Sequence, residues 1–523
     1  MSVLLHELHL EHAEKRPDTT AIVFEERRLT YQQVEEQSNR LAHALADRRI
    51  EAGDRIALLL PKCPEAVVAM LAVMKVGAIY VPLDPASPTA RLGKVIASCE
   101  PAIILAGGVK ADVAIEVSRI CTAPLAWMGP GPAPEKLQPA FSPNDTYSPA
   151  TSPLERKVSP TDPAHILFTS GSTGQPKGVV ITHAMVAEFI TWANGYFGTT
   201  EQDKVSGHSP LFFDLSTFDI YGALAAGAEL HMVPPNANLL PHKLADFIRR
   251  SKLTQWFSVP SILNYMAKFD VIEEDDFPSL QRILWCGEVF PTAALRHWMQ
   301  KLPKIRFTNL YGPTEATIAS SYYTLPCCPA DDREEVPIGT ACAGEELMVL
   351  DDRLERVAPG GVGDLYIAGV GLSPGYWRNP EASRAAFLEH EGGRIYKTGD
   401  LAKVDESGLF YYLGRADSQI KSRGYRIELG EIETALHSLD FLRECAVVAI
   451  DTGGFEGHTI CCAYAVQENV STAPPAIKAR LRQLIPPYMI PSRWLCLDEL
   501  PKTPNGKIHR PALRERFQAE MNA

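Results

Sequence analysis

The most restrictive feature of this sequence is an alternation of short apolar runs and longer helical patterns in its first half. Residues 56–60 form a short apolar run, residues 64–75 follow a helical pattern, and a second apolar run lies at 80–82. Strand, helix and strand at this spacing predict βαβ units, in which a helix joins two parallel strands. Upstream, Thr30 and Gln33 have the spacing of a capping box, which predicts the start of another helix. We therefore expect an α/β fold with mostly parallel sheets.

The chain is long enough for several compact units. Its 523 residues correspond to about three to four domains of ordinary size. Between residues 129 and 163, Pro, Ser and Thr dominate without an apolar period, which predicts a linker or a long loop. The pattern changes again near Gly414, and the remaining part of the chain carries a predicted helix over 431–439 and a predicted strand over 445–450. We expect this part to be a small, separate α+β domain.

Charge and cysteine content exclude several classes of protein. The net charge of −12 is unfavourable for general binding to nucleic acid backbones. The chain has neither an N-terminal signal pattern nor a run of about 20 apolar residues, so we expect a cytoplasmic protein that does not contact membranes. Its 11 cysteines are scattered and form no C-x-x-C motif, which favours reduced thiols over disulfides or a zinc site.

Residues 168–178, Phe-Thr-Ser-Gly-Ser-Thr-Gly-Gln-Pro-Lys-Gly, are typical of a phosphate-binding loop. Glycines let the backbone approach a ligand closely, and successive amides form a nest for an anion. The loop is not a Walker A motif, because Pro176 precedes Lys177 and Gly178 follows it, so a P-loop kinase is disfavoured. The residues that we expect to contact a polyphosphate are Thr169, Ser170, Gly171, Ser172, Thr173, Gly174 and Lys177.

Seven further motifs accompany this loop in a fixed order. They occupy residues 74–84, 309–315, 363–369, 396–400, 414–433, 487–491 and 505–507. Together they resemble the adenylate-forming enzymes, which include amino-acid adenylation domains of nonribosomal peptide synthetases, acyl-CoA synthetases and luciferases. The two longest motifs are most similar to the amino-acid adenylation branch. The resemblance implies a large adenylation core over 1–417, which binds ATP and the amino acid, and a mobile lid over 418–523, which carries the catalytic lysine.

The resemblance also implies how ATP is used. A substrate carboxylate is joined to the α-phosphorus of ATP, giving an acyl-AMP and pyrophosphate. The implied catalytic residues are Thr314 at the α-phosphate, Glu315 as a ligand of Mg²⁺, and Lys507, which neutralises charge on the carboxylate and the α-phosphate. Taken singly, Glu315 also suits a helix start and Lys507 a solvated turn. The other implied nucleotide contacts are Asn309, Tyr311 and Gly312 for adenine, and Asp400, Tyr412 and Arg415 for ribose.

The segment 213–216 resembles the amino-acid branch at the position that receives the substrate. There the resemblance implies that Asp214 pairs with the α-ammonium group, although a cap for the following helix is the alternative. The other implied pocket residues are Leu215, Phe218, Ser258, Leu284, Cys286, Leu310, Ile318 and Ala319. None of them is charged, so a charged substrate side chain would lack a partner. We expect a small neutral side chain, and proline, alanine, cysteine, serine or a non-proteinogenic residue all remain open.

A second half-reaction is implied by the lid. Asp417 lies at the position of the hinge, about which the lid rotates so that residues 424–426 line a thioester site. The implied acceptor is the phosphopantetheine thiol of a carrier protein. Only 16 residues follow Lys507, so we expect a free-standing enzyme whose carrier is a separate protein, or less readily CoA.

Two alternatives stay open at this point. The first is an acyl- or aryl-CoA ligase of the same family, which Asp214 argues against because such substrates have no ammonium group. The second is a nucleotide-binding protein without turnover. The joint presence of Glu315 and Lys507 argues against it, since only catalysis needs both.

Overall fold

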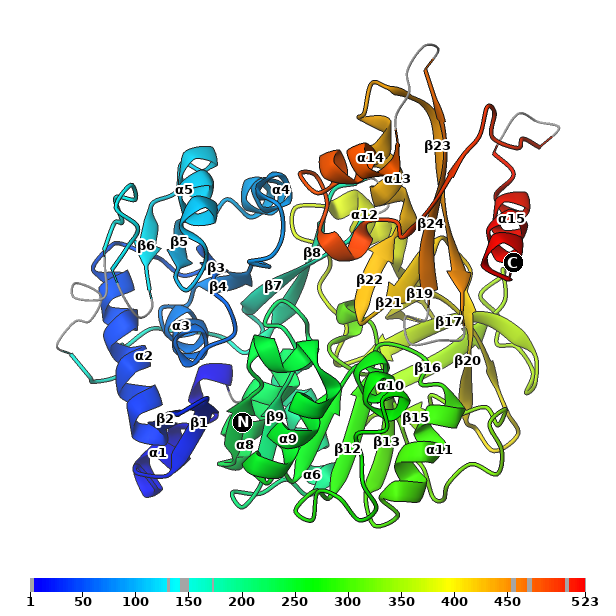
Figure 1. The fold of residues 1–523 in the computed structure, drawn as a ribbon. Helices are drawn as coiled ribbons and strands as arrows, with labels where there is room; N and C mark the ends of the chain where they lie inside the picture. The colour runs from blue at the N-terminus through cyan, green and yellow to red at the C-terminus, as the bar shows by residue number, and fades with distance from the viewer. Residues whose placement is uncertain are drawn as a thin grey trace. The chain divides into compact units, whose positions relative to one another are not determined.

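A computed structural model describes residues 4–128, 132–141, 150–171, 174–452, 458–467, 473–503 and 508–522 (Figure 1). Its contacts divide the chain into two compact units. Unit 1 comprises Met1–Pro85, Ile96–Phe168 and Gly178–Ala416, and unit 2 comprises Ala86–Val95, Thr169–Lys177 and Asp417–Ala523. The division of roles between a core and a lid stays a prediction. No helix in the described part of the chain is long and apolar enough to cross a membrane.

The largest sheet of unit 1 has nine strands. Its order is β15-β14-β13-β12-β11-β9-β10-β1-β2. The strands between β1 and β13 in this order pair in parallel, while β2, β14 and β15 add antiparallel edges. The bounds are β1 (Thr20–Phe24), β2 (Arg27–Thr30), β9 (Lys204–Gly207), β10 (Glu229–Met232), β11 (Gln255–Ser258), β12 (Arg282–Cys286), β13 (Arg306–Tyr311), β14 (Ser321–Thr324) and β15 (Thr340–Ala341).

A second, six-stranded sheet contains the predicted βαβ unit. Its strands, in the order β6-β5-β3-β4-β7-β8, are β3 (Arg55–Leu59), β4 (Ile79–Pro82), β5 (Ile103–Ala106), β6 (Leu125–Trp127), β7 (Pro163–Thr169) and β8 (Lys177–Thr182). β3 and β4 are parallel neighbours and α3 (Pro64–Lys75) joins them, so this prediction is confirmed. Every residue of α3 except Glu65 is buried, as expected for a helix that is apolar on nearly all faces.

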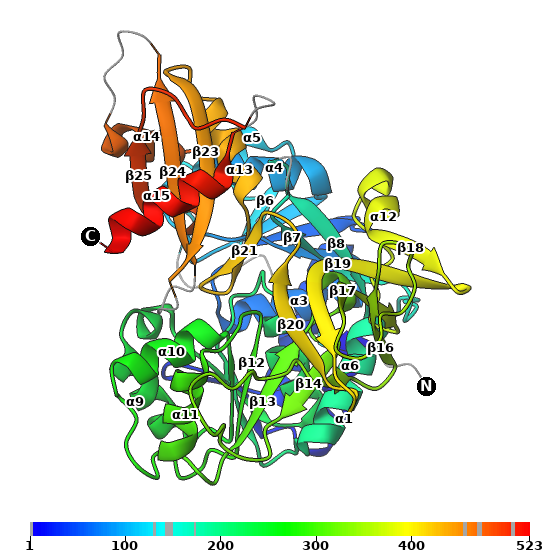
Figure 2. The same cartoon turned by 90° about the vertical axis from the view of Figure 1, so that its right-hand side faces the viewer.

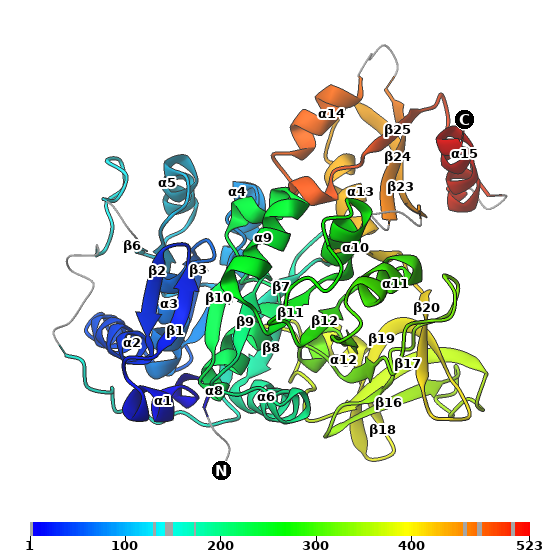
Figure 3. The same cartoon turned by 60° about the horizontal axis from the view of Figure 1, so that its bottom comes forward.

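Helices complete one hydrophobic core with residues of both sheets. α2 (Tyr31–Ala46) begins at the predicted capping box, in which the backbone amide of Gln33 donates to the Thr30 hydroxyl at 3.2 Å. α2 lies beside α3, and α6 (His183–Phe197) contributes to the same core (Figure 3). The other helices before residue 417 are η1 (Leu5–Glu7), α1 (Leu10–Lys15), α4 (Thr89–Cys99), α5 (Ala111–Ile120), α7 (Leu215–Thr217), η2 (Phe218–Gly222), α8 (Ala223–Ala226), η3 (Pro235–Leu239), α9 (Pro241–Ser251), α10 (Pro260–Lys268), α11 (Thr292–Lys301), η4 (Thr314–Ala316) and α12 (Pro380–Ala386).

A third sheet of unit 1 is antiparallel throughout (Figure 2). Its strands are β16 (Glu345–Leu350), β17 (Val362–Gly369), β18 (Phe387–His390), β19 (Gly393–Val404) and β20 (Phe410–Arg415). The long strand β19 pairs with β17, β18 and β20. In the predicted linker, the described residues 132–141 and 150–162 contain neither helix nor strand.

Unit 2 contains the C-terminal α+β domain. Its elements are β21 (Gln419–Ser422), β22 (Tyr425–Glu428), α13 (Leu429–His437), β23 (Leu442–Asp451), β24 (His458–Val466), α14 (Pro474–Leu481), η5 (Pro487–Met489), β25 (Arg493–Cys496) and α15 (Arg510–Asn522). The predicted helix and strand correspond to α13 and β23. One face of the β23-β24-β25 sheet packs on α13 and α14, and the other face packs on α15.

Candidate active site

The predicted substrate pocket gathers at the carboxyl ends of the parallel strands in the nine-stranded sheet. Ser258 is the last residue of β11, Cys286 is the last of β12, and Leu310 precedes the last residue of β13. Cys286 lies opposite Leu310 in the ladder, and its thiol donates to the Ile318 carbonyl at 3.8 Å. All four side chains are buried. This edge of an open α/β sheet is where ligands usually bind.

The segment that follows β13 is held in an unusual backbone conformation. Thr317 and Ile318 have φ angles of 55° and 68°, which non-glycine residues rarely adopt. The Thr317 hydroxyl donates to the Gly371 carbonyl at 2.8 Å, which fixes this turn against the end of β17. At Gly312, a Cβ atom would lie 2.5 Å from the Cα atom of Ala319, so only glycine fits there. These contacts therefore fix the backbone that carries Thr314, Ile318 and Ala319.

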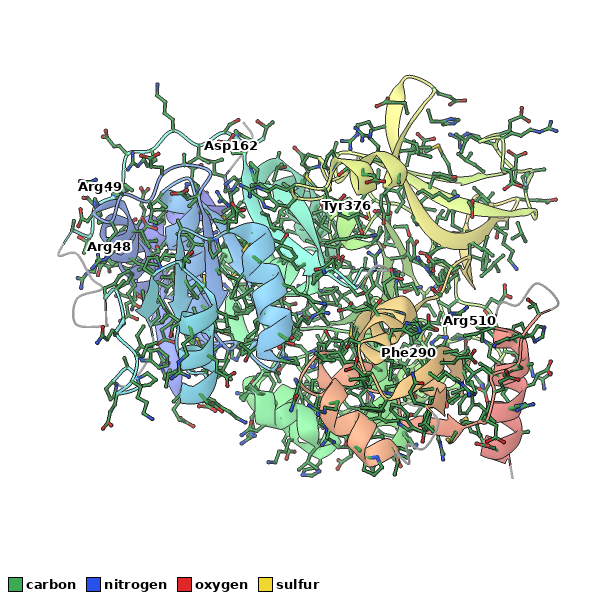
Figure 4. The ribbon with its side chains drawn as sticks, turned by 90° about the horizontal axis from the view of Figure 1, so that it is seen from above. Arg48, Arg49, Asp162, Phe290, Tyr376 and Arg510 are labelled. Atoms are coloured by element: carbon green, nitrogen blue, oxygen red, sulfur yellow. The ribbon has the colours of Figure 1, made fainter. Side chains whose placement is uncertain are left out.

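Glu315 is fully buried within this segment. The Tyr376 hydroxyl donates to its Oε1 atom at 2.8 Å. Residues 375–377 form an antiparallel bridge with β8, which fixes the position of Tyr376 (Figure 4). Glu315 does lie in the first turn of η4, as the helix-start alternative expects, but its burial and the Tyr376 bond are more than that position requires. Sequence reasoning missed Tyr376, because 61 residues separate it from Glu315 and no motif links the two.

A second buried carboxylate lies where β19 pairs with β20. Asp400 and Arg415 are direct cross-strand partners, and Arg415 donates to Asp400 Oδ1 at 2.8 Å. The Tyr311 hydroxyl donates to the other oxygen of Asp400. Burial, followed by the charge of Asp400, raises the pKa of Tyr311 well above its usual range, so this phenol stays a donor. Three of the predicted nucleotide contacts are therefore brought together.

Two other predicted nucleotide contacts lie nearby. The ring of Tyr412 is 6.4 Å from the ring of Tyr311, centroid to centroid. Asn309 is buried, and its side-chain amide donates to the Pro337 carbonyl at 2.9 Å. The amide oxygen of Asn309 is not used in that bond, and it remains suited to an amino group such as that of adenine.

The phosphate loop belongs to unit 2 and connects β7 with β8. The Gly174 amide donates to the Gly171 carbonyl at 2.9 Å, and the Thr169 hydroxyl donates to the Lys177 carbonyl at 3.4 Å. A Cβ atom at position 171 would overlap the Gln175 carbonyl oxygen, and Gly174 has a φ of 73°. Both glycines are therefore required by the turn itself. Ser170 is buried, while Ser172 and Thr173 lie outside the described residues.

Asp214 precedes α7, and its side chain makes no capping hydrogen bond to that helix. The structure therefore opposes the reading of Asp214 as a helix cap. Its side chain is half-buried, whereas Leu215 and Phe218 are fully buried. The ring of Phe218 packs edge-on against Phe189 of α6, with the centroids 5.4 Å apart.

Two of the predicted pocket residues have no surface accessible to solvent. Leu284 is inaccessible to solvent, and so is Ser258, whose hydroxyl accepts from the Trp256 indole at 2.9 Å. Ser258 also donates to the Val259 carbonyl at 3.2 Å. A serine whose hydroxyl already has two partners is a structural neighbour of the pocket wall rather than an obvious substrate contact.

The structure describes the predicted hinge residue but not the predicted catalytic lysine. Asp417 is the first residue of the C-terminal segment of unit 2, and its carboxylate accepts from the backbone amide of Gln419 at 3.0 Å. Its role as a hinge stays a prediction. Lys507 lies outside the described residues.

Comparisons with known proteins agree with this combination of fold and site. The family model described as AMP-binding enzyme matches residues 10–377, and the model of the AMP-binding enzyme C-terminal domain matches residues 431–507. The chain belongs to the AMP-binding enzyme family, and the resemblance to adenylate-forming enzymes is thereby confirmed.

Individual relatives are similar over nearly the whole chain. Bacitracin synthase 1 of Bacillus licheniformis is 34% identical over 514 residues, which are 98% of this chain and 9% of that protein. The chain thus spans about a tenth of the length of this relative. The adenylation domain AlmE of Vibrio cholerae, solved with glycyl-adenosine-5'-phosphate, has a TM-score of 0.84 and 25% identity over 98% of both chains. PA1221, an NRPS protein containing adenylation and PCP domains, has a TM-score of 0.82 and 25% identity over 98% of this chain and 84% of that chain.

Proposed function

We propose that this protein activates a small neutral α-amino acid with ATP and passes it to a carrier thiol. In the first half-reaction a carboxylate oxygen of the amino acid attacks the α-phosphorus of ATP. The bond from that phosphorus to the bridging oxygen breaks, and pyrophosphate leaves. In the second, a phosphopantetheine thiolate of a separate carrier protein attacks the acyl carbon, forming a thioester and releasing AMP.

The proposal of an amino acid as the substrate rests on the surroundings of the Asp214 carboxylate. This carboxylate makes no capping hydrogen bond to α7, and the predicted pocket residues that follow it in the sequence, Leu215 and Phe218, are buried. A half-buried carboxylate beside an apolar wall is a suitable partner for an ammonium group. AlmE, whose solved structure holds glycyl-adenosine-5'-phosphate, is in keeping with an amino-acid substrate.

The residues present suit ATP and Mg²⁺. The close packing of Gly171 against the Gln175 carbonyl leaves no room for a side chain, as expected in a tight glycine-rich loop whose amides would bind phosphate oxygens. Asp400, oriented by Arg415 and Tyr311, suits the two hydroxyls of a ribose because each of its oxygens can accept a further bond. Glu315, oriented by Tyr376, would hold Mg²⁺, which when bound supplies charge neutralisation for the phosphates. Thr314 would donate to the α-phosphate, and Lys507 would balance the charge on the two reacting groups.

The second half-reaction rests on the C-terminal domain. Asp417 would act as the hinge, and residues 424–426 would line the path of the thiol. PA1221, a similar protein that contains both adenylation and PCP domains, supports a carrier as the acceptor. CoA is the alternative acceptor.

Pyrophosphate release tests this function directly. The twenty common amino acids, hexanoate and benzoate would each be offered with Mg²⁺ and ATP. We expect release with one or a few small neutral amino acids and none with the two acids that lack an ammonium group. Release with hexanoate or benzoate alone would instead assign an acyl- or aryl-CoA ligase, and no release with any acid would favour a protein without turnover.

A matched pair of variants refines the test. Asp214→Ala should lower kcat/KM at least about tenfold, because a lost bond to a charged group costs about 1.5–3 kcal/mol. Asp246→Ala is the control, since Asp246 lies on the surface of α9, where it pairs with Arg249 of the same helix. Equal activity of the two variants would remove Asp214 from the substrate site.

A further inference from the structure

A small pocket in unit 1 lies beside the predicted amino-acid site. It is lined by Phe189 and Trp192 of α6, by Ala319, and by Glu345 at the start of β16. The pocket is nearly filled by these side chains and has room for about one water-sized group. Among its lining residues, Glu345 is the only one with a formal charge.

The Glu345 carboxylate has one satisfied and one unsatisfied oxygen. Its Oε1 atom accepts from the Gly371 amide at 2.7 Å. Its Oε2 atom is buried and has no hydrogen-bond partner among the residues that the structure describes. A buried acceptor without a donor is destabilising, so a donor from outside the chain would be favoured here.

The backbone is shaped around this carboxylate. A Cβ atom at position 371 would lie 2.7 Å from Glu345 Oε1, and one at position 369 would lie 2.9 Å from Oε2. Gly369 also has a φ of 137°, which only glycine adopts readily. Gly369, the last residue of β17, and Gly371, two residues later, therefore leave room for the acid and for its backbone, which argues for a constructed feature rather than a chance surface group.

The pocket shares its walls with the predicted amino-acid site. Ala319 belongs to both. Phe189, which lines the pocket, packs edge-on against Phe218, which we expect to line the amino-acid site. A substrate side chain that extends past Ala319 would therefore point toward Glu345.

We propose that this pocket is the distal end of the substrate side-chain site, and that Glu345 Oε2 accepts a hydrogen bond from a hydroxyl or amide group at the end of that side chain. The proposal rests on the proposed amino-acid activation and adds a requirement to it. The substrate is neutral and ends in a hydrogen-bond donor. A site that bonds a substrate hydroxyl rejects the analogue without it much more strongly than an apolar pocket discriminates by size.

The small number of hydrogen-bond acceptors in the pocket favours a neutral group over an ammonium group. An ammonium group carries three donors, and the pocket offers it one unsatisfied carboxylate oxygen. Among the other lining side chains, Thr317 has a hydroxyl, which already donates to the Gly371 carbonyl, and Phe189, Trp192 and Ala319 have no acceptor. Burial raises the pKa of Glu345 to about 7, so an assay at pH 8 would hold most of this carboxyl in the ionised, accepting form.

The test compares amino acids of similar shape that differ in one donor. The pairs are serine with 2-aminobutyrate, threonine with valine, homoserine with norvaline, and asparagine with leucine. We expect the wild-type protein at pH 8 to show a kcat/KM for pyrophosphate release at least about 100-fold higher for the donor member of one pair. Equal activity within every pair would overturn the proposal, as would a higher activity with ornithine or lysine.

The variant Glu345→Gln separates binding from folding. Glutamine keeps an oxygen for the Gly371 amide but replaces Oε2 with an amide donor, so the preference within the active pair should fall at least about tenfold. Glu346→Gln is the matched control, because Glu346 is exposed and pairs with Arg356. If both variants kept the wild-type preference, Glu345 would have no role in selection. Should Glu345→Gln fail to fold, the wild-type comparison still decides.

Failure of this proposal can be distinguished from failure of the proposed function. Pyrophosphate release with amino acids but without any preference for a donor contradicts the role of Glu345 alone. An absence of release with every amino acid contradicts the activation itself.

Discussion

Replacing Tyr376 with phenylalanine removes one hydroxyl group from a fully buried carboxylate. In the wild-type protein this hydroxyl donates to Glu315 Oε1 at 2.8 Å, and the Glu315 side chain has no exposed surface. The ring of Tyr376 also packs against Phe387, with centroids 5.9 Å apart, and phenylalanine keeps that contact. The change therefore isolates the hydrogen bond.

The expected cost in stability follows from the charge and burial of the acceptor. A hydrogen bond to a charged group contributes about 1.5–3 kcal/mol to the free energy of unfolding. With an unfolding entropy of about 2.1 cal/mol/K per residue, and about 400 residues in unit 1, this corresponds to a fall of about 2–4 °C in Tm. Scanning calorimetry measures the shift. Tyr411→Phe is the control, because Tyr411 donates at 3.2 Å to Asp405, a carboxylate at a solvent-exposed turn, and should change Tm by less than about 1 °C.

The same variant tests the proposed role of Glu315. If this carboxylate holds Mg²⁺, a loss of its orienting partner should raise the Mg²⁺ concentration for half-maximal pyrophosphate release about 10–100-fold. A lower Tm with unchanged Mg²⁺ dependence would contradict the metal role. An unchanged Tm would contradict the hydrogen bond itself.

Three further predictions concern the nucleotide site and the C-terminal domain. Arg415→Met leaves Asp400 buried without its cationic partner, so the free energy of unfolding in urea should fall by about 3–5 kcal/mol, and a loss below about 1 kcal/mol would contradict the pairing. Lys507→Ala should abolish pyrophosphate release while the circular dichroism spectrum stays unchanged, and full activity would remove Lys507 from its role. Asp417→Pro should reduce thioester formation more than pyrophosphate release, because proline restricts the φ of a hinge, and equal losses in both half-reactions would contradict the hinge.

Local sequence signals predicted the elements that depend on local interactions. The bounds of α3 agree with those predicted, because Pro64 suits the first turn of a helix and Gly77 adopts the positive φ that follows its end. The capping box of Thr30 and Gln33 joins residues three apart, so its two bonds follow from the sequence. The helix α13 begins two residues before the predicted start, directly after β22, where no stop signal separates strand from helix.

Long-range contacts of the candidate site could not be predicted in the same way. The motifs named Glu315 and Asp400, but the Tyr376 bond to Glu315 depends on pairing of residues 375–377 with β8. The positive φ angles at Thr317 and Ile318 have no signature in the residue types, because glycine would have been expected there. Glu345 had no motif at all, since its environment is assembled from α6, β16 and the end of β17.

The central claim is that a carboxylate oxygen of an amino acid is joined to the α-phosphorus of ATP. The most direct test uses the activated amino acid labelled with ¹⁸O in both carboxylate oxygens, with mass spectrometry of the nucleotide product. Attack by the carboxylate, followed by transfer of the acyl group to a thiol or to water, leaves one carboxylate oxygen on phosphorus. The account therefore predicts AMP that carries one ¹⁸O atom, released together with pyrophosphate. Unlabelled AMP, or ADP with inorganic phosphate, would contradict it.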